Sequence, residues 1–134
     1  MKTKKLILIL TALPFIFISC GNSFAEQIKR EMQTLKSQCP QYQGDGITIT
    51  DANFYESEKI LEYVCSIEGV EYIEADIVEE MKKGIVEALI SDVSAFEKYS
   101  VKIALKNGYR YRYIYTDTSG NELCEIEVTK DDLP

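Results

Sequence analysis

The chain has 134 residues, of which 46% are hydrophobic, and its formal net charge is −7. It contains no histidine, which excludes Ser–His, Cys–His and zinc–histidine chemistry because the commonest general base and metal ligand is missing. The acidic balance argues against a nucleic-acid partner, whose phosphates need a basic surface. We therefore expect no catalytic residue, no metal site and no cofactor.

The first twenty residues predict export. Three lysines at positions 2, 4 and 5 precede an apolar run over 6–18, which is the pattern of a signal peptide. Residues 17–20 resemble the lipobox of bacterial lipoproteins, although Phe17 stands where that motif usually has Leu. The resemblance implies cleavage before Cys20 and attachment of diacylglycerol to its sulfur. We expect a signal peptide over 1–19, a lipidated Cys20 with a short tether over 20–22, and one domain over 23–134.

Two alternatives remain open for this leader. The small residues Ser23 and Ala25 flank Phe24 in the pattern that ordinary signal peptidase cleaves, and cleavage after Ala25 would release a protein without lipid. The apolar run could also stay in place as an uncleaved anchor. That run is 13 residues long, which falls short of the roughly 20 residues that span a bilayer.

The first predicted element of the domain is a helix from Ser23 to Cys39. Ser23 and Glu26 have the spacing of a capping box, which satisfies free backbone groups at the start of a helix. Apolar residues then recur every three or four positions, as they do on the buried face of a helix: Phe24, Ile28, Met32, Leu35 and Cys39. Pro40 and the turn over 44–46 end this helix.

Two strands are expected next, joined as a hairpin. The segment 47–55 is rich in β-branched and aromatic residues, which favour strands. In the segment 59–68 apolar and polar residues alternate, which predicts a half-buried strand with Cys65 facing inward. The polar residues 56–58 form the expected turn between them.

A second amphipathic helix is predicted over 76–96. Asp76 and Glu79 form a variant of the capping box at its start. Six apolar residues then follow at helical spacing: Ile77, Met81, Ile85, Leu89, Val93 and Phe96.

Three more strands complete the predicted sheet, separated by turn residues at 107–108 and 118–121. Their ranges are 101–105, 109–116 and 123–128. The expected fold class is therefore α+β, with the order α-β-β-α-β-β-β: an N-terminal helix, a β-hairpin, a second helix and a three-stranded antiparallel meander. Helices on one face of the sheet are the expected packing.

The strand over 109–115 is the best candidate for a ligand-binding site. Alternation places four tyrosines on one of its faces: Tyr109, Tyr111, Tyr113 and Tyr115. Aligned tyrosines can stack on sugars or grip a peptide, but we favour the alternative that they cover the sheet against a helix, because tyrosine fits strands well. Arg110 and Arg112 on the other face are expected to pair across strands with Glu125 or Glu127.

The remaining cysteines indicate at most one disulfide. Lipidation of Cys20 leaves Cys39, Cys65 and Cys124, an odd number in a compartment where disulfides persist. A bridge between Cys39 and Cys65 is the candidate considered, and the sequence does not fix the pairing among the three. Four acidic residues in predicted strands and loops do not match a calcium-binding loop and are expected to be solvated: Asp45, Asp51, Glu56 and Glu58.

Several short patterns resemble a set of small bacterial envelope lipoproteins of unknown function. They are Cys39-Pro40 after a first helix, Gly-Ile-Thr-Ile-Thr over 46–50, alternating tyrosines over 109–113, and Ser119-Gly120 in the turn before the last strand. The resemblance implies a compact α+β domain that is exported to the envelope. It transfers no catalytic residue.

These features predict a non-catalytic, membrane-tethered binding or scaffolding module. Lipid on Cys20 would bind the membrane, and a protein or glycan would be the further partner. Gly21 replaces the Asp that acts as an inner-membrane retention signal in some Gram-negative bacteria, so we expect the outer membrane. Without the three leader lysines, the chain has twelve basic and 22 acidic side chains, which gives a net charge of −10. The alternative is therefore an inhibitor or immunity-type factor against a basic, envelope-attacking enzyme.

Overall fold

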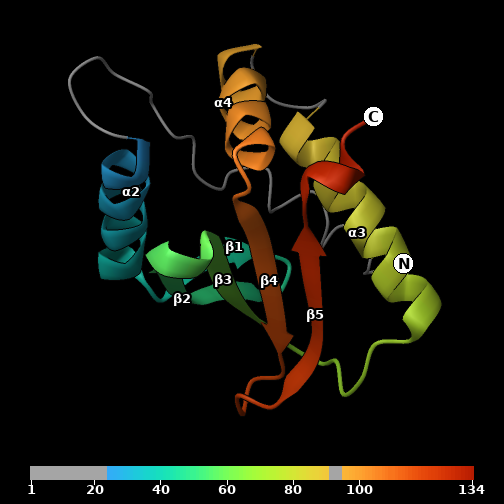
Figure 1. The fold of residues 1–134 in the computed structure, drawn as a ribbon. Helices are drawn as coiled ribbons and strands as arrows, with labels where there is room; N and C mark the ends of the chain where they lie inside the picture. The colour runs from blue at the N-terminus through green and yellow to red at the C-terminus, as the bar shows by residue number, and fades with distance from the viewer. Residues whose placement is uncertain (1–23, 91–94) are drawn as a thin grey trace.

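One mixed β-sheet covered by helices makes up the protein in a computed structural model that describes residues 24–90 and 95–134 (Figure 1). The helices are α2 (Phe24–Gln38), α3 (Ala75–Ile90) and α4 (Ala95–Lys106), with short 3₁₀ turns η2 (Glu56–Glu58) and η3 (Lys130–Asp132). The strands are β1 (Gln41–Gly44), β2 (Ile47–Tyr55), β3 (Ile60–Ile67), β4 (Arg110–Thr116) and β5 (Glu122–Val128). The expected α+β class is confirmed.

The sheet is mixed rather than antiparallel throughout. Its strand order is β1-β2-β3-β4-β5. The pair β3–β4 is parallel, whereas the other three pairs are antiparallel. A parallel pair needs a long crossover between its strands. Here α3 and α4 together form that crossover.

The predicted strand over 101–105 was wrong, because these residues belong to α4. Val101, Ala104 and Leu105 are buried apolar residues of α4, and this spacing of three and four is helical. Five residues are too few to separate a period of two from a period of 3.6. Gly108, with φ of +88°, lies just past the end of α4 and donates its N–H to Leu105 O, so the expected hairpin turn is a helix C-terminus.

The second predicted helix was also too long. Helix α3 ends at Ile90 and α4 begins at Ala95, so two helices replace the single one expected over 76–96. Val93 lies outside the described residues. The turn over 44–46, expected only to end the first helix, is the hairpin turn that joins the short strand β1 to β2.

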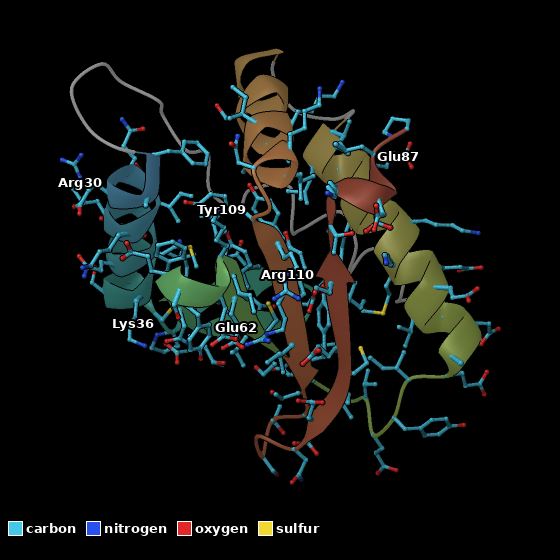
Figure 2. All side chains as sticks on the ribbon, in the orientation of Figure 1. Arg30, Lys36, Glu62, Glu87, Tyr109 and Arg110 are labelled. Carbon is cyan, nitrogen blue, oxygen red and sulfur yellow. The ribbon has the colours of Figure 1, made fainter. Side chains whose placement is uncertain are left out.

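All three helices pack on the same face of the sheet, as predicted. Side chains from α2, α3 and α4 share one buried cluster with alternate residues of the strands. The helices contribute Ile28, Met32, Met81, Ile85, Leu89, Ile90, Val101, Ala104 and Leu105. The opposite face carries polar side chains and has no described helix over it (Figure 2). Within residues 24–90 and 95–134, no helix has the length and apolar character needed to cross a membrane.

Candidate functional site

The tyrosines of the expected binding strand lie in the core of the structure. Tyr109, Tyr111, Tyr113 and Tyr115 are 7%, 2%, 0% and 1% exposed. Tyr113 stacks on Tyr63 with ring centroids 5.2 Å apart. The cause is alternation: β4 turns its odd-numbered residues toward the face that the helices cover. These rings therefore pack against the helices, as the alternative interpretation has it, and present no accessible surface to a ligand.

Burial dominates the chemistry of these phenols. It raises the pKa of Tyr63, Tyr111, Tyr113 and Tyr115 above the ordinary tyrosine value, because the interior disfavours phenolate. The Tyr63 hydroxyl is fully buried and has no hydrogen-bond partner among the described residues. These groups stay neutral in the folded protein, so their phenolate forms are not available as bases near neutral pH.

Cys39, Cys65 and Cys124 are free thiols in the structure. Cys65 is buried in β3, and burial raises its pKa to about 12, while burial raises the pKa of Cys124 to about 11. The Cys39 thiol donates to the carbonyl oxygen of Leu35 at 3.3 Å, which turns it back onto the end of α2. The expected bridge between Cys39 and Cys65 is not formed here. Cys20, the expected lipid-bearing residue, lies outside the described residues.

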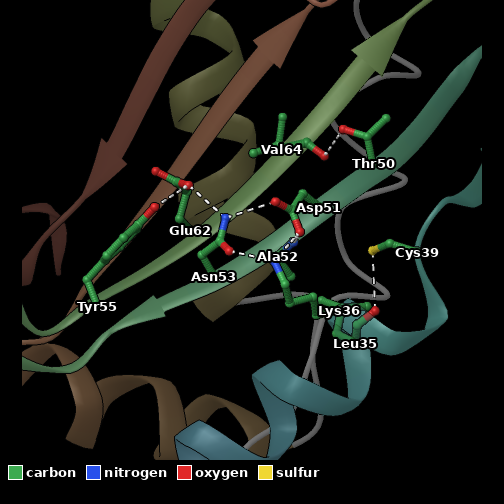
Figure 3. Close-up of polar contacts among 10 residues, drawn as sticks. All are labelled: Leu35, Lys36, Cys39, Thr50, Asp51, Ala52, Asn53, Tyr55, Glu62 and Val64. Atoms are coloured by element: carbon green, nitrogen blue, oxygen red, sulfur yellow. Dashed lines mark hydrogen bonds and ion pairs between the residues drawn. The ribbon is translucent and has the colours of Figure 1, made fainter.

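A connected cluster of polar side chains lies on the uncovered face of the sheet (Figure 3). At its centre is Glu62 of β3, whose side chain is only 7% exposed. Arg112 of β4 donates from Nε and Nη2 to Glu62 Oε2 at 2.9 and 2.7 Å. On the other oxygen, Glu62 Oε1 accepts from Asn53 Nδ2 at 3.1 Å and from the Tyr55 hydroxyl at 3.3 Å. Both carboxylate oxygens are thus used by neighbouring side chains.

The same cluster extends to helix α2 through Lys36. The Lys36 ammonium donates to Asp51 Oδ1 at 2.7 Å and to Asn53 Oδ1 at 2.8 Å. Asn53 Nδ2 also donates to Asp51 Oδ2 at 3.2 Å, so one amide bridges Asp51 and Glu62. Although desolvation opposes it, hydrogen bonds from Lys36 and Asn53 lower the pKa of Asp51. The cluster therefore ties α2, β2, β3 and β4 together.

The arginines meet the expectation of cross-strand pairing in part. Arg110 Nη1 lies 2.7 Å from Glu127 Oε1 on β5, as expected. Arg112 pairs with Glu62 instead of Glu125 or Glu127. The register of the parallel pair places Glu62 directly opposite Arg112. Sequence reasoning missed Glu62 because it placed β3 in a separate hairpin rather than beside β4.

The other acidic candidates do not join into a site. Asp45 lies in the β1–β2 turn, and Glu56 and Glu58 lie in η2, whereas Asp51 is held by Lys36. Among the described residues, no group of three or more metal-ligating side chains is placed to hold an ion. With its carboxylates already bonded, the polar cluster fits a structural role better than acid–base chemistry.

The described surface has several hollows, three of which lie beside α3, beside α2 and beyond the ends of β3 and β4. One of about 640 Å³ lies between α3 and the C-terminal residues and is lined by Lys82, Val86, Ile90 and Pro134 among others. One of about 250 Å³ lies between α2 and β2, beside Lys36 and Asn53 of the polar cluster. The third, about 680 Å³, is an open depression beyond the ends of β3 and β4.

Solved structures of bacterial proteins are similar in fold to this chain. The type II secretion system pilotin AspS from Vibrio cholerae matches with a TM-score of 0.52 at 13% identity, over 98% of this chain and 96% of that one. The type II secretion pilotin EpsS from Vibrio vulnificus matches with a TM-score of 0.57 at 12% identity, over 99% and 97%. A protein from Pseudomonas aeruginosa described as secreted matches with a TM-score of 0.54 at 11% identity, over 84% and 98%. At these identities the likeness establishes a shared fold.

Sequence comparison identifies a family without assigning an activity. No curated protein matches this sequence. Residues 23–124 match the model of the family described as "Domain of unknown function (DUF8479)", which spans most of the chain, and the protein therefore belongs to that family.

Proposed function

We propose that this protein is a lipid-anchored accessory protein of the bacterial envelope, with a non-catalytic binding or scaffolding role like that of a pilotin. The observation that carries the proposal is the likeness of fold to two type II secretion system pilotins over nearly the full length of both chains. The lipobox-like leader ending at Cys20 supports it independently, because it implies a lipid anchor.

The described surface favours binding over catalysis. The tyrosines that would be the chemical groups of a sugar or peptide cleft are buried, and the carboxylates of the polar cluster are engaged by Lys36, Asn53 and Arg112. What stays accessible is a rigid sheet face and the edges of that sheet. Such surfaces suit docking of another protein.

The proposed location is the outer membrane of a Gram-negative bacterium. Acyl chains on Cys20 would hold the protein there, since several chains bind firmly where one alone is marginal. The proposed partner is a protein component of an envelope assembly such as a type II secretion system. The acidic surface contributes no attraction to anionic lipid, so the lipid would be the sole membrane contact.

The experiment is fractionation of envelopes from Gram-negative cells that produce the full chain, its Cys20→Ser variant or a matched Cys124→Ser control. We expect the wild type and the control to sediment with the outer membrane and to have a mass that starts at Cys20 plus acyl chains. The Cys20→Ser variant should lose the lipid and leave the outer-membrane fraction. A wild-type mass that starts at Glu26 without lipid would overturn the anchored role.

A second candidate, an inhibitor of a basic envelope-attacking enzyme, is favoured by one observation. All 22 acidic residues lie beyond the leader, giving the net charge of −10. Binding to lysozyme, measured by calorimetry at low and high salt, tests it. Binding that persists at high salt would support inhibition, whereas binding that salt abolishes and that any acidic protein matches would reject it.

A further inference from the structure

The outer edge of β5 is the longest unpaired strand edge of the described sheet. In the strand order β5 has β4 as its sole described neighbour, and it runs over seven residues, Glu122–Val128 (Figure 1). The opposite edge strand, β1, has four residues and an irregular register near Gly44. Natural proteins blunt edges with short strands, bulges and prolines, because a free edge presents unpaired backbone groups. β1 is blunted in this way, whereas β5 is longer and contains no proline, although it carries glutamates and its pairing with β4 is also irregular, next to Thr116.

The two faces of β5 have opposite character. Cys124, Ile126 and Val128 lie on the helix-covered face, where Ile126 and Val128 are buried. Glu125 and Glu127 lie on the uncovered face. Arg110 already binds Glu127, but the Glu125 side chain is exposed. A strand added to this edge would run beside buried apolar side chains on one face and beside acidic ones on the other.

The glutamates on β5 indicate which kind of polypeptide segment could pair with this edge. If two copies of the protein paired through their β5 edges, glutamates would lie near glutamates, and like charges opposite each other destabilise a strand pair. Lysine or arginine facing Glu125 and Glu127 would instead form favourable cross-strand pairs. An extended segment in which basic and apolar residues alternate therefore fits both faces at once.

We propose that the β5 edge binds an extended segment of a partner protein, with alternating basic and apolar residues, as a sixth antiparallel or parallel strand. Backbone hydrogen bonds along the edge would give affinity, and Glu125 would select basic residues. The inference rests on the proposed binding role and names the class of partner that the role would take.

The test uses the full chain purified in detergent and a synthetic peptide of alternating lysine and valine. Hydrogen–deuterium exchange by mass spectrometry reports whether backbone amides of β5 become protected. We expect protection confined to residues 122–128, with exchange there slowed about tenfold at saturating peptide. The variant Glu125→Lys should weaken binding about fivefold. Glu58→Lys, in η2 between β2 and β3, is the matched charge control and should bind as the wild type does.

Three outcomes would overturn the proposal. They are no binding of the peptide, binding without protection of β5, and equal weakening by the Glu125→Lys and Glu58→Lys substitutions. The latter two would mean general attraction to an acidic surface. Because the assay needs neither lipid nor a membrane, its failure is distinguishable from failure of the proposed envelope location, which the fractionation of Cys20→Ser tests separately.

Discussion

Glu62 and Arg112, which are 50 residues apart in the chain, lie directly opposite each other on the parallel strands β3 and β4. Two guanidinium nitrogens of Arg112 donate to the same carboxylate oxygen, and Glu62 is almost fully buried. A charge removed from water in this way needs a partner. The ion pair therefore helps to fix the register of β3 against β4, the two strands that the crossover of α3 and α4 connects.

Removing the Arg112 side chain should destabilise the folded protein. We expect Arg112→Ala to lower the free energy of unfolding by about 2–3 kcal/mol, because it leaves the Glu62 carboxylate buried without a cation. Urea unfolding followed by circular dichroism measures the loss. Lys36→Ala is the matched control: its pair with Asp51 is exposed on both sides, so its effect should be much smaller. Equal losses in the two variants would show that water reaches Glu62 and that the pair does not organise the sheet.

Removing the buried hydroxyl of Tyr63 should have the opposite effect and raise the free energy of unfolding. We expect Tyr63→Phe to raise the free energy of unfolding by about 1 kcal/mol, because it removes a buried hydroxyl with no hydrogen-bond partner among the described residues. Thermal and urea unfolding report the change. Tyr63→Ala should instead cost about 3–5 kcal/mol through loss of the stacked ring. A destabilised Tyr63→Phe variant would mean that a buried water satisfies the hydroxyl.

The elements that local sequence patterns mark were predicted correctly. The predictions were wrong where the structure depends on contacts between distant parts of the chain. Helix α2 and strands β2, β3, β4 and β5 were all expected, because capping residues, alternation and turns mark them. The five residues from Val101 to Leu105 were assigned to a strand, since so short an apolar pattern fits both periods. This one error removed the second half of the crossover and with it the parallel pairing of β3 and β4.

The surroundings of the candidate tyrosines depend on a related, non-local property. Alternation correctly put the tyrosines of β4 on one face, but which face the helices cover is a tertiary property. The partner of Arg112 depends on which strand lies beside β4, and nothing local marks Glu62 as that residue. Once the parallel pair is known, the register gives Glu62 directly.

A side chain at Gly46 should destabilise the β1–β2 turn. This residue has φ of +80°, and a Cβ there would lie 3.2 Å from Glu68 Cβ. We expect Gly46→Ala to lower the free energy of unfolding by about 1–2 kcal/mol, from backbone strain and crowding together. Gly120→Ala is the control. Its φ is +91°, but a Cβ added there would have no described atom within 4 Å apart from its chain neighbours, so backbone strain acts alone and the loss of stability should be smaller. Equal losses in urea unfolding would show that Glu68 moves aside at no cost.

Alkaline pH should destabilise the folded protein through its buried thiols. The pKa of Cys65 is raised by burial to about 12, from 9.0 in an exposed chain. Between these values the unfolded state has lost a proton that the folded state keeps, so the free energy of unfolding falls as pH rises. The stabilisation is fully present below pH 9 and is lost toward pH 12, at up to about 1.4 kcal/mol per pH unit from this thiol.

The check is urea unfolding at pH 8, 9 and 10 under reducing conditions, with each variant compared with the wild type because the buried tyrosines add to the slope as pH nears 10. We expect the wild type to lose stability between pH 9 and 10, and Cys65→Ala to lose less over the same interval. Cys39→Ala is the control, since its thiol is only partly buried and should leave the slope nearly intact. Repeating the series without reductant tests the pairing of Cys39 with Cys65, because a disulfide removes the titrating thiol and flattens the wild-type curve. A wild-type slope that is flat even with reductant would mean that solvent reaches Cys65.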